Sequence, residues 1–323
     1  MSDSEPSYLD GFEARRETQT ELSRLERLYD RVDQKLPYIM IAPVFIIVVG
    51  LMLYPAVWAF KLSLYDVPIS NLDNQVFVGF QNYVEILMNS FFYKVMKNSV
   101  VFVSASVVGQ VGIGVTLAVL LDRGWLDDRL ARFFRATYIL PWATTAVIVG
   151  YSWQFLLNPR VGLVNQFLRA LGWANPPPWL TSVQWAIVGL IIMNIWRGTP
   201  FSMIFQTSGL QSIQESFYEA ARVGGASRLQ TVRNVTLPLL RPFILMNLIL
   251  VTLFTFNVFG MILVMTGGGP LDATNVLALH MYQTAFSLGN FGKASALAVL
   301  LFLFNLLTVA FYLRVFGGVD QAI

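Results

Sequence analysis

The sequence lacks cysteine entirely and holds one histidine, His280. Without cysteine the chain cannot form a disulfide, an iron–sulfur cluster or a thiolate zinc site. A single histidine leaves little with which to build a serine–histidine triad or a metal centre. We therefore expect neither catalytic residues nor a metal site, and this argues against a membrane-embedded enzyme.

Charge is also scarce. Charged residues make up 13% of the 323 residues and hydrophobic residues 55%, whereas about 25% of an average soluble domain is charged. All 19 aspartates and glutamates fall outside the long apolar runs. Ion-coupled transporters usually keep carboxylates within the membrane. Their absence here disfavours ion coupling, so any energy source would have to be another chain.

What the sequence does contain is six long apolar runs. Each is close to the roughly 20 residues that a helix needs to cross a hydrocarbon core of about 30 Å. Open strands would leave backbone groups unpaired in lipid, and barrel strands would be shorter and alternating. We therefore predict an all-α membrane protein with six transmembrane helices. The predicted spans are residues 38–60, 100–121, 136–157, 185–206, 243–265 and 294–313.

Lysine and arginine predict the orientation of these spans. Counted over alternate connecting segments, they divide 15 against 6, with Arg197 inside a span, and the richer set is expected in the cytoplasm. Both termini should then be cytoplasmic. Residues 1–36 predict a cytoplasmic amphipathic helix lying against the membrane surface or a neighbouring subunit, and residues 317–323 a short tail. The basic residues form no single patch, so we expect no nucleic-acid partner.

A segment rich in alanine and glycine lies between the fourth and fifth predicted spans, within residues 211–241. It predicts a short helix that breaks at Gly224–Gly225, followed by a second helix that ends at Pro238. Two short helices at an angle would form a protrusion with a surface carboxylate and small side chains. Such a protrusion suits docking into a groove on a partner protein, although an ordinary pair of membrane-surface helices could have the same composition.

This loop resembles the signature of the permease subunits of ATP-binding-cassette importers, which places glycine and then leucine-proline after Glu-Ala-Ala. The matching residues are Glu219, Ala220, Ala221, Gly225, Ala226, Val235, Leu237, Pro238 and Pro242. Five further patches fit the carbohydrate branch of that family, typified by maltose permease. They are residues 77–83, 140–142, 158–165, 194–201 and 266–270. The resemblance covers residues 37–316.

The resemblance implies a type I importer permease fold in a prokaryotic inner membrane. It also implies a second permease as heterodimer partner, two cytoplasmic subunits that bind ATP and Mg, and an external solute-binding protein. This chain itself would hold no cofactor. The loop would be the coupling helix seated in a cleft of the ATPase. Its coupling residues would be Glu219, Ala220, Ala221, Gly225, Ala226 and Pro238.

Polar and aromatic groups that interrupt the apolar spans indicate the pathway, because they are costly against lipid and tend to face the interior. In maltose-permease relatives the sugar contacts match Gly198, Phe201 and Thr255. The expected pathway residues are Asn194, Arg197, Gly198, Phe201, Thr255 and Asn257. The asparagines could instead join helices, and Arg197 could meet an anionic cargo or cap a helix. Gln110 lies among small residues in the second span and is expected to serve helix packing.

The sequence thus predicts a transport subunit for a sugar, driven by partner ATPases. Two alternatives stay open. The cargo could be an anionic sugar derivative or a glycerol phosphate, since Arg197 lies in a predicted span. A facilitator that works without ATP would need no loop shaped for a cytoplasmic partner, so the loop counts against it.

Overall fold

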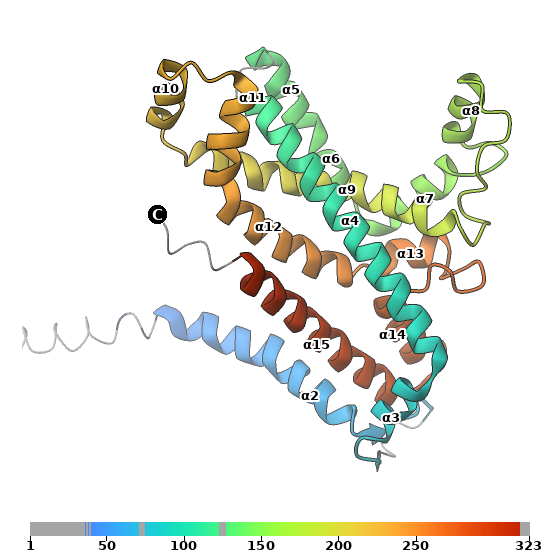
Figure 1. The fold of residues 1–323 in the computed structure, drawn as a ribbon. Coiled ribbons are helices and arrows are strands. Elements are labelled where there is room, and N and C mark those ends of the chain that lie inside the picture. The colour runs from blue at the N-terminus through green and yellow to red at the C-terminus, as the bar shows by residue number, and fades with distance from the viewer. Residues whose placement is uncertain (1–35, 37, 39, 71–74, 123–126, 317–323) are drawn as a thin grey trace, which may run out of the picture. The chain divides into compact units, whose positions relative to one another are not determined.

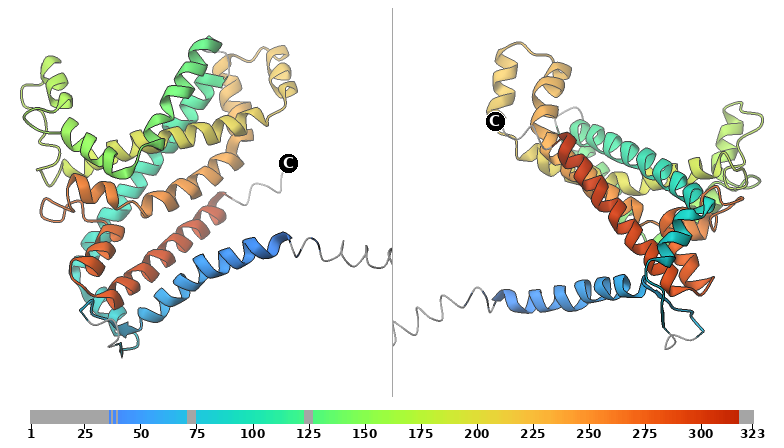
Figure 2. Two further views of the ribbon diagram at one scale, coloured as in Figure 1. Left: turned by 180° about the vertical axis from the view of Figure 1, so that it is seen from behind. Right: turned by 60° about the horizontal axis from the view of Figure 1, so that its bottom comes forward.

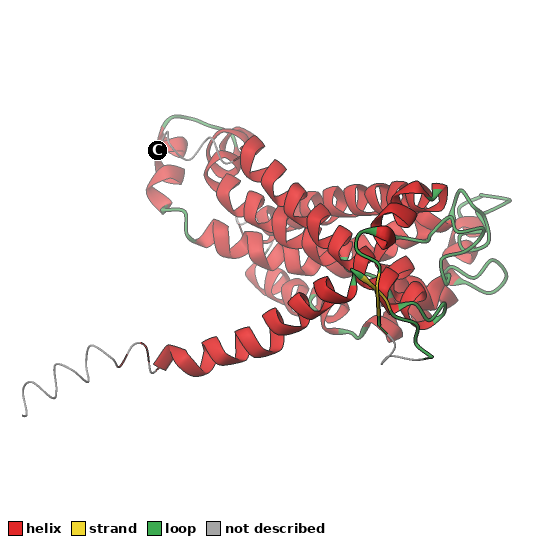
Figure 3. Cartoon of the chain, turned by 90° about the horizontal axis from the view of Figure 1, so that it is seen from below, coloured by secondary structure: helices red, strands yellow, loops and turns green. Residues whose placement is uncertain are grey.

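The computed structural model of this chain describes residues 36, 38, 40–70, 75–122 and 127–316. The described part is almost entirely helical, with a single pair of two-residue strands (Figure 3). The amphipathic helix predicted within residues 1–36 and the tail at residues 317–323 fall on residues outside the described ones, Leu36 apart.

The chain divides into two units, Met1–Ala59 and Phe60–Ile323. The elements are η1 (Val49–Leu53), α2 (Tyr54–Leu62), β1 (Tyr65–Asp66), β2 (Val76–Phe77), α3 (Gln81–Met88), α4 (Ser90–Asp122), α5 (Asp128–Tyr138), α6 (Leu140–Ala143), α7 (Ala146–Leu156), α8 (Leu163–Ala170), α9 (Ala186–Gln211), α10 (Glu215–Val223), α11 (Arg228–Thr231), η2 (Val232–Thr236), α12 (Leu237–Phe256), α13 (Gly260–Met265), α14 (Leu277–Phe286) and α15 (Phe291–Phe316). The two π-helical turns, η1 and η2, lie inside longer helices.

Five helices in the described residues are long and apolar enough to cross a membrane. They are Met40–Leu62, Ser90–Asp122, Ala186–Gln211, Arg228–Phe256 and Phe291–Phe316. These correspond to the first, second, fourth, fifth and sixth predicted spans, although α4 begins ten residues earlier than the predicted second span. The chain is therefore a mostly helical protein with at least five helices of membrane-spanning length.

The third predicted span, residues 136–157, is wrong as a single helix, because it is divided among α5, α6 and α7. Pro141 has no amide hydrogen to continue the helix from α5. Thr144 and Thr145 then adopt extended backbone, with ψ of 141° and 147°. What remains continuous and apolar is α7, with 11 residues, which is shorter than the roughly 20 residues of a straight span.

The fifth predicted span, residues 243–265, is also interrupted. α12 ends at Phe256, and α13 begins at Gly260 after a short non-helical stretch. The Asn257 side-chain amide donates to the Leu253 carbonyl over 2.8 Å, which satisfies one of the carbonyl groups that a helix end leaves unpaired. The apolar run therefore predicted correctly that this segment is helical, but it did not predict where the helix ends.

The second unit has its core between the long helices. α4 packs along α9 and α12, and α12 packs against α15 (Figure 1). The core side chains include Phe102, Leu190, Met193, Ile262 and Leu297, all less than 2% exposed. By contrast, apolar side chains on the outer face of α15 are exposed. An apolar outer surface around a packed interior is what a lipid environment favours.

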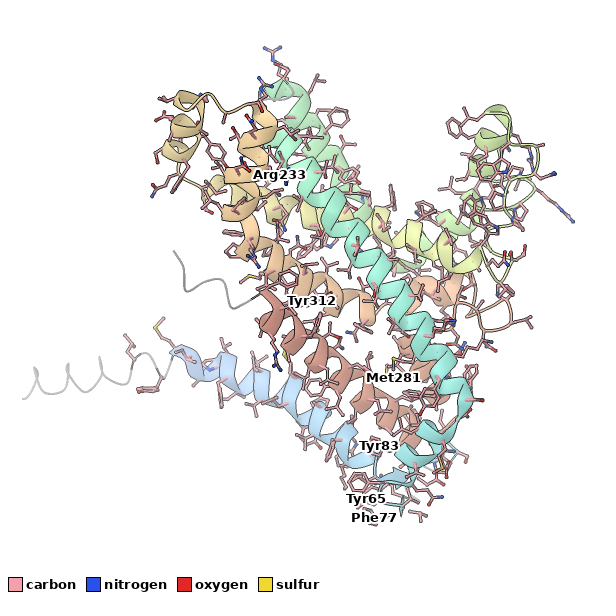
Figure 4. The ribbon with its side chains drawn as sticks, in the orientation of Figure 1. Tyr65, Phe77, Tyr83, Arg233, Met281 and Tyr312 are labelled. Atoms are coloured by element: carbon pink, nitrogen blue, oxygen red, sulfur yellow. The ribbon has the colours of Figure 1, made fainter. Side chains whose placement is uncertain are left out.

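Opposite ends of this helical unit carry different elements. α10 and α11 lie together at one end, and α3 and α14 lie at the other end of α4 (Figures 1 and 2). At the α3 end, Tyr65 pairs with Phe77 across the two strands, with ring centres 5.3 Å apart (Figure 4). The buried Asn82 amide donates to the carbonyls of Ser63 and Tyr65, and this fixes α3 against the strand pair.

An ion pair joins α3 to α15 at this end. The Lys293 Nζ lies 2.6 Å from the Glu85 carboxylate. The hydrogen bond from Lys293, and a second one from Gln81, lower the pKa of Glu85. A carboxyl whose pKa is lowered by folding stabilises the fold above its unfolded pKa, and this contribution is lost as the pH falls through the folded pKa.

Substitution of Glu85 should therefore reduce the stability of the fold less at acidic pH than at neutral pH. We expect Glu85→Gln to lower the thermal transition of the detergent-solubilised protein at about pH 7, and the difference from wild type to shrink towards about pH 3. The measurement is a thermal melt of both proteins across that range. If the two thermal transitions differed by the same amount at every pH, the negative charge of Glu85 would not be the source of the difference, and the prediction would be wrong.

Candidate functional site

A cavity of about 530 Å³ lies among α4, α6, α9 and α12. The lining includes all six residues that the sequence assigns to a pathway, which are Asn194, Arg197, Gly198, Phe201, Thr255 and Asn257. The remaining lining residues are Gln110, Trp142, Val251, Leu253, Phe254 and Val258. The structure therefore brings together two groups of residues that are more than 50 positions apart in the sequence.

Helical spacing explains how α9 supplies four of these residues. Asn194, Arg197, Gly198 and Phe201 follow the i, i+3, i+4, i+7 pattern that places side chains on one face of a helix. α9 continues unbroken through Pro200. The Thr199 hydroxyl, next to the proline, donates to the Ile195 carbonyl over 2.6 Å. One uninterrupted helix face thus forms one wall of the cavity.

The C-terminal end of α12 supplies the facing wall. Thr255 is buried in the last turn of this helix, and Asn257 is the exposed residue that ends it. Deeper in the protein, the buried Asn247 joins α12 to α9, because it exchanges hydrogen bonds with the Ser202 hydroxyl and carbonyl. This asparagine is a helix-joining residue, whereas Asn194 and Asn257 line the cavity.

Two lining residues were missed or given another role in the sequence interpretation. Gln110 of α4 was expected to serve helix packing, but its side chain also lines the cavity. Trp142 of α6 stacks on Phe201, with ring centres 6.0 Å apart and an angle of 25° between the planes. An isolated amide in an apolar helix was the signal for Gln110. The signal for Trp142 was its place in the family-like patch at residues 140–142.

The absence of a side chain at Gly198 is what allows Gln110 to sit beside it. A Cβ atom at position 198 would overlap the Gln110 amide group. Gly114 on α4 is similarly crowded, since a Cβ there would lie 2.5 Å from the Ser202 Cβ. Close approach through small residues is a common way of packing membrane helices. Here it also sets the shape of one wall of the cavity.

The loop between α9 and α12 forms a second candidate site at the other end of α9. α10 ends at Val223, and Gly225 follows with φ of +74°. The Ala226 amide donates to the Ala221 carbonyl, and the Gly225 amide donates to the Arg222 carbonyl. This is the Schellman arrangement, in which glycine adopts the left-handed conformation without steric cost. The predicted break at Gly224–Gly225 is therefore confirmed.

The two carboxylates of α10 differ in their surroundings. Glu215 forms an ion pair of 2.9 Å with Arg222 on the same helix. Glu219 is exposed, and within the described part of the chain its carboxylate has no hydrogen-bond or ion-pair partner. Ala220 is exposed beside it, and Ala221 and Ala226 are half-buried. The loop thus presents an unpaired carboxylate next to small side chains.

The prediction that Pro238 ends the second helix of the loop is wrong. The helix continues from Arg228 to Phe256. Ser227 and Gln230 form a capping box at its start, and Arg233 lies on the π-helical turn η2 that precedes Pro238 (Figure 4). The π-helical turn η2 changes the hydrogen-bonding pattern just before Pro238, so that the helix continues past a proline that would otherwise interrupt its backbone hydrogen bonds. Pro238 lies at the start of α12, apart from the turn that holds Gly225 and Ala226.

A smaller cavity of about 260 Å³ separates α10 from α11 and η2. Its lining combines charged and small groups, namely Glu215, Tyr218, Arg222, Ala226, Arg228, Thr231, Val232 and Thr236. α10 and α11 are therefore two arms (Figure 2), and this cavity lies between their side chains.

The chain is similar to known transport proteins. The trehalose/maltose transport system permease protein MalF of Thermococcus litoralis is 33% identical over 88% of this chain and 94% of its own length. The sulfoquinovosyl glycerol transport system permease protein SmoG of Agrobacterium fabrum is 30% identical over 93% of this chain and 96% of its own length.

A solved structure shares the fold. It is the crystal structure of a bacterial ABC transporter involved in the import of the acidic polysaccharide alginate. It matches with a TM-score of 0.76 and 22% identity, and covers 91% of this chain and 99% of its own chain. Residues 110–319 match the family described as binding-protein-dependent transport system inner membrane component. This range contains all the residues that line the cavity and the whole of the α10–α11 loop. The protein belongs to that family of membrane transport components.

Proposed function

We propose that this chain is one of two permease subunits of an ATP-binding-cassette importer and that it forms half of the pathway for a sugar. The proposal includes a six-span topology with both termini in the cytoplasm of a prokaryote. The third crossing would then be made by the broken segment of α5, α6 and α7. The second permease would be a different chain, and a binding protein outside the cell would deliver the sugar.

The observation that carries the proposal is the single cavity that collects the six expected pathway residues. Its lining pairs amides and a hydroxyl with aromatic rings, as in Asn194, Thr255 and the stacked Trp142–Phe201 pair. Amides and hydroxyls hydrogen-bond sugar hydroxyls, and flat aromatic faces cover the apolar face of a sugar ring. Relatives named for trehalose/maltose and for sulfoquinovosyl glycerol support a carbohydrate cargo.

The loop at the opposite end of α9 would couple transport to ATP hydrolysis. In this proposal α10 docks in a cleft of the ATPase subunit, and Glu219 pairs with a basic residue there. ATP and Mg would be bound by the two ATPase subunits. Gly225 keeps the bend between α10 and α11, so that movement of α10 is passed to α12 through a continuous helix from Arg228. Alternating access would follow as a rigid-body motion of the helices.

The experiment that tests the proposal is purification of the tagged protein from native membranes in mild detergent, with every accompanying chain identified and quantified. We expect one second permease and two ATPase chains for each copy. Recovery of this chain only as a homo-oligomer, with no ATPase chain, would overturn the proposal.

A further inference from the structure

Arg197 is the one charged residue among the described residues that line the cavity of about 530 Å³. Its Nε atom is buried, and it has no hydrogen-bond partner among the described residues. No salt bridge of Arg197 is present in that part of the chain either. Arg197 as a whole is half-buried. A charge that is partly withdrawn from water without a partner is costly, and ionisable groups inside membrane segments are kept mainly where they have a function.

The helices of the cavity cannot supply a counter-charge from their own sequence. No aspartate or glutamate occurs between Asp128 and Glu215, or between Glu219 and Asp272. These two gaps include the whole of α6, α7, α9, α12 and α13. The lining residue from α4 is Gln110, which is neutral. The negative partner of Arg197 must therefore come from outside this group of helices.

A second unpaired donor lies one turn away on the same helix face. Asn194 is 4% exposed, and its Nδ2 group is buried without a hydrogen-bond acceptor. Both residues line the cavity, so a guanidinium and an amide offer donors to the same space. Two unsatisfied donors on one helix face, beside an apolar aromatic wall, form a site for an acceptor-only group attached to an apolar ring face.

We propose that this cavity receives an anionic carbohydrate and that Arg197, with Asn194, binds its compact acidic group, which is a carboxylate, a sulfonate or a phosphate. This inference rests on the proposed function and narrows its substrate class. The planar guanidinium fits such groups with two parallel hydrogen bonds. The stacked Trp142 and Phe201 rings cover the sugar ring beside it. A carboxylate from the second permease is the competing partner for Arg197.

The test uses the complete importer in liposomes, with its own binding protein and internal ATP. Uptake is measured for matched probes, namely a disaccharide ending in glucuronate against the same disaccharide ending in glucose, its 6-sulfated form, and glycerol 3-phosphate against glycerol. We expect uptake of an anionic probe and not of its neutral counterpart. Arg197→Gln should lower kcat/KM for that probe by at least about 30-fold, as for loss of one partner of a buried charge pair.

Two control variants separate binding from general effects. Arg197→Lys keeps the charge without the planar fork and should retain more uptake than Arg197→Gln. Lys97→Gln removes an exposed cation outside the cavity and should leave kcat/KM unchanged. The affinity of the binding protein for each probe is measured separately. Because the variants are in the permease, this affinity should be the same in all of the experiments.

Three results would overturn the inference. One is ATP-driven uptake of neutral sugars alone, which would leave the proposed function standing. Another is equal uptake of an anionic probe by wild type and Arg197→Gln. The third is a combined result, in which the second permease no longer co-purifies with Arg197→Gln and the importer carries only neutral sugars. This result would assign Arg197 to the interface between the two permeases. Absence of ATP-driven uptake of every carbohydrate would count against the proposed function as well.

Discussion

Glu219→Lys is expected to reduce ATP-driven uptake by at least about 100-fold while the permease still assembles. Glu219 is exposed on α10, and its carboxylate has no partner within the described residues. In the proposed complex it pairs with a cation of the ATPase. Reversal of its charge would place two cations together, and like charges at an interface cost several kcal/mol. Uptake in liposomes and the amount of ATPase that co-purifies are the measurements.

Glu215→Lys provides the matched control for this variant. It makes the same change of charge on the same helix, but Glu215 is already paired with Arg222 within α10. Loss of an exposed ion pair costs at most about 1 kcal/mol. We therefore expect near-normal uptake from this control. Equal loss in both variants would indicate a general effect of charge on α10, and normal uptake by Glu219→Lys would contradict the coupling role.

Gly198→Ala is expected to reduce uptake about tenfold or more without unfolding the protein. The added methyl group would overlap the Gln110 amide. Because this amide is the free end of a flexible side chain, it can turn away and occupy part of the cavity. A single extra methylene in a binding pocket changes selectivity by roughly 10- to 200-fold. The measurements are the uptake rate and the thermal transition of the purified complex.

A compensating variant makes this prediction specific. Gln110→Ala in the Gly198→Ala background removes the overlapping amide, so uptake should recover towards that of Gln110→Ala alone. Gly112→Ala adds the same methyl group to α4 where no atom lies within 4 Å, and it should be neutral. If the double variant shows no more uptake than Gly198→Ala alone, Gly198 acts through something other than its contact with Gln110.

The six residues that the sequence assigned to a pathway could be predicted to lie in the protein interior because most of their signals are local, and the structure places all six around one cavity. Asn194 and Arg197 interrupt an apolar helix, and helical spacing places them on one face with Phe201, which the family resemblance indicated. Thr255 and Asn257 were found by the same reasoning on another helix. Their meeting in one cavity depends on the packing of α9 against α12, which no short stretch of sequence encodes. Gln110 was assigned to packing because it lies on a face of small residues in the second predicted span.

Helix ends were harder to predict than helices. Apolar composition marked residues 136–157 as helical, but the break at Thr144–Thr145 depends on backbone angles that composition does not reveal. The opposite error occurred at Pro238, where proline predicted an end. There the π-helical turn η2 keeps the helix continuous. Gly224–Gly225 was predicted correctly because a left-handed residue after a helix strongly favours glycine.

The measurement that tests the central claim most directly is uptake by the reconstituted complex with and without ATP. We expect the carbohydrate to enter liposomes against its gradient only when ATP is hydrolysed and the external binding protein is present. Equilibration of the carbohydrate by this chain alone, at the same rate with or without ATP, would contradict the account and identify the protein as a facilitator.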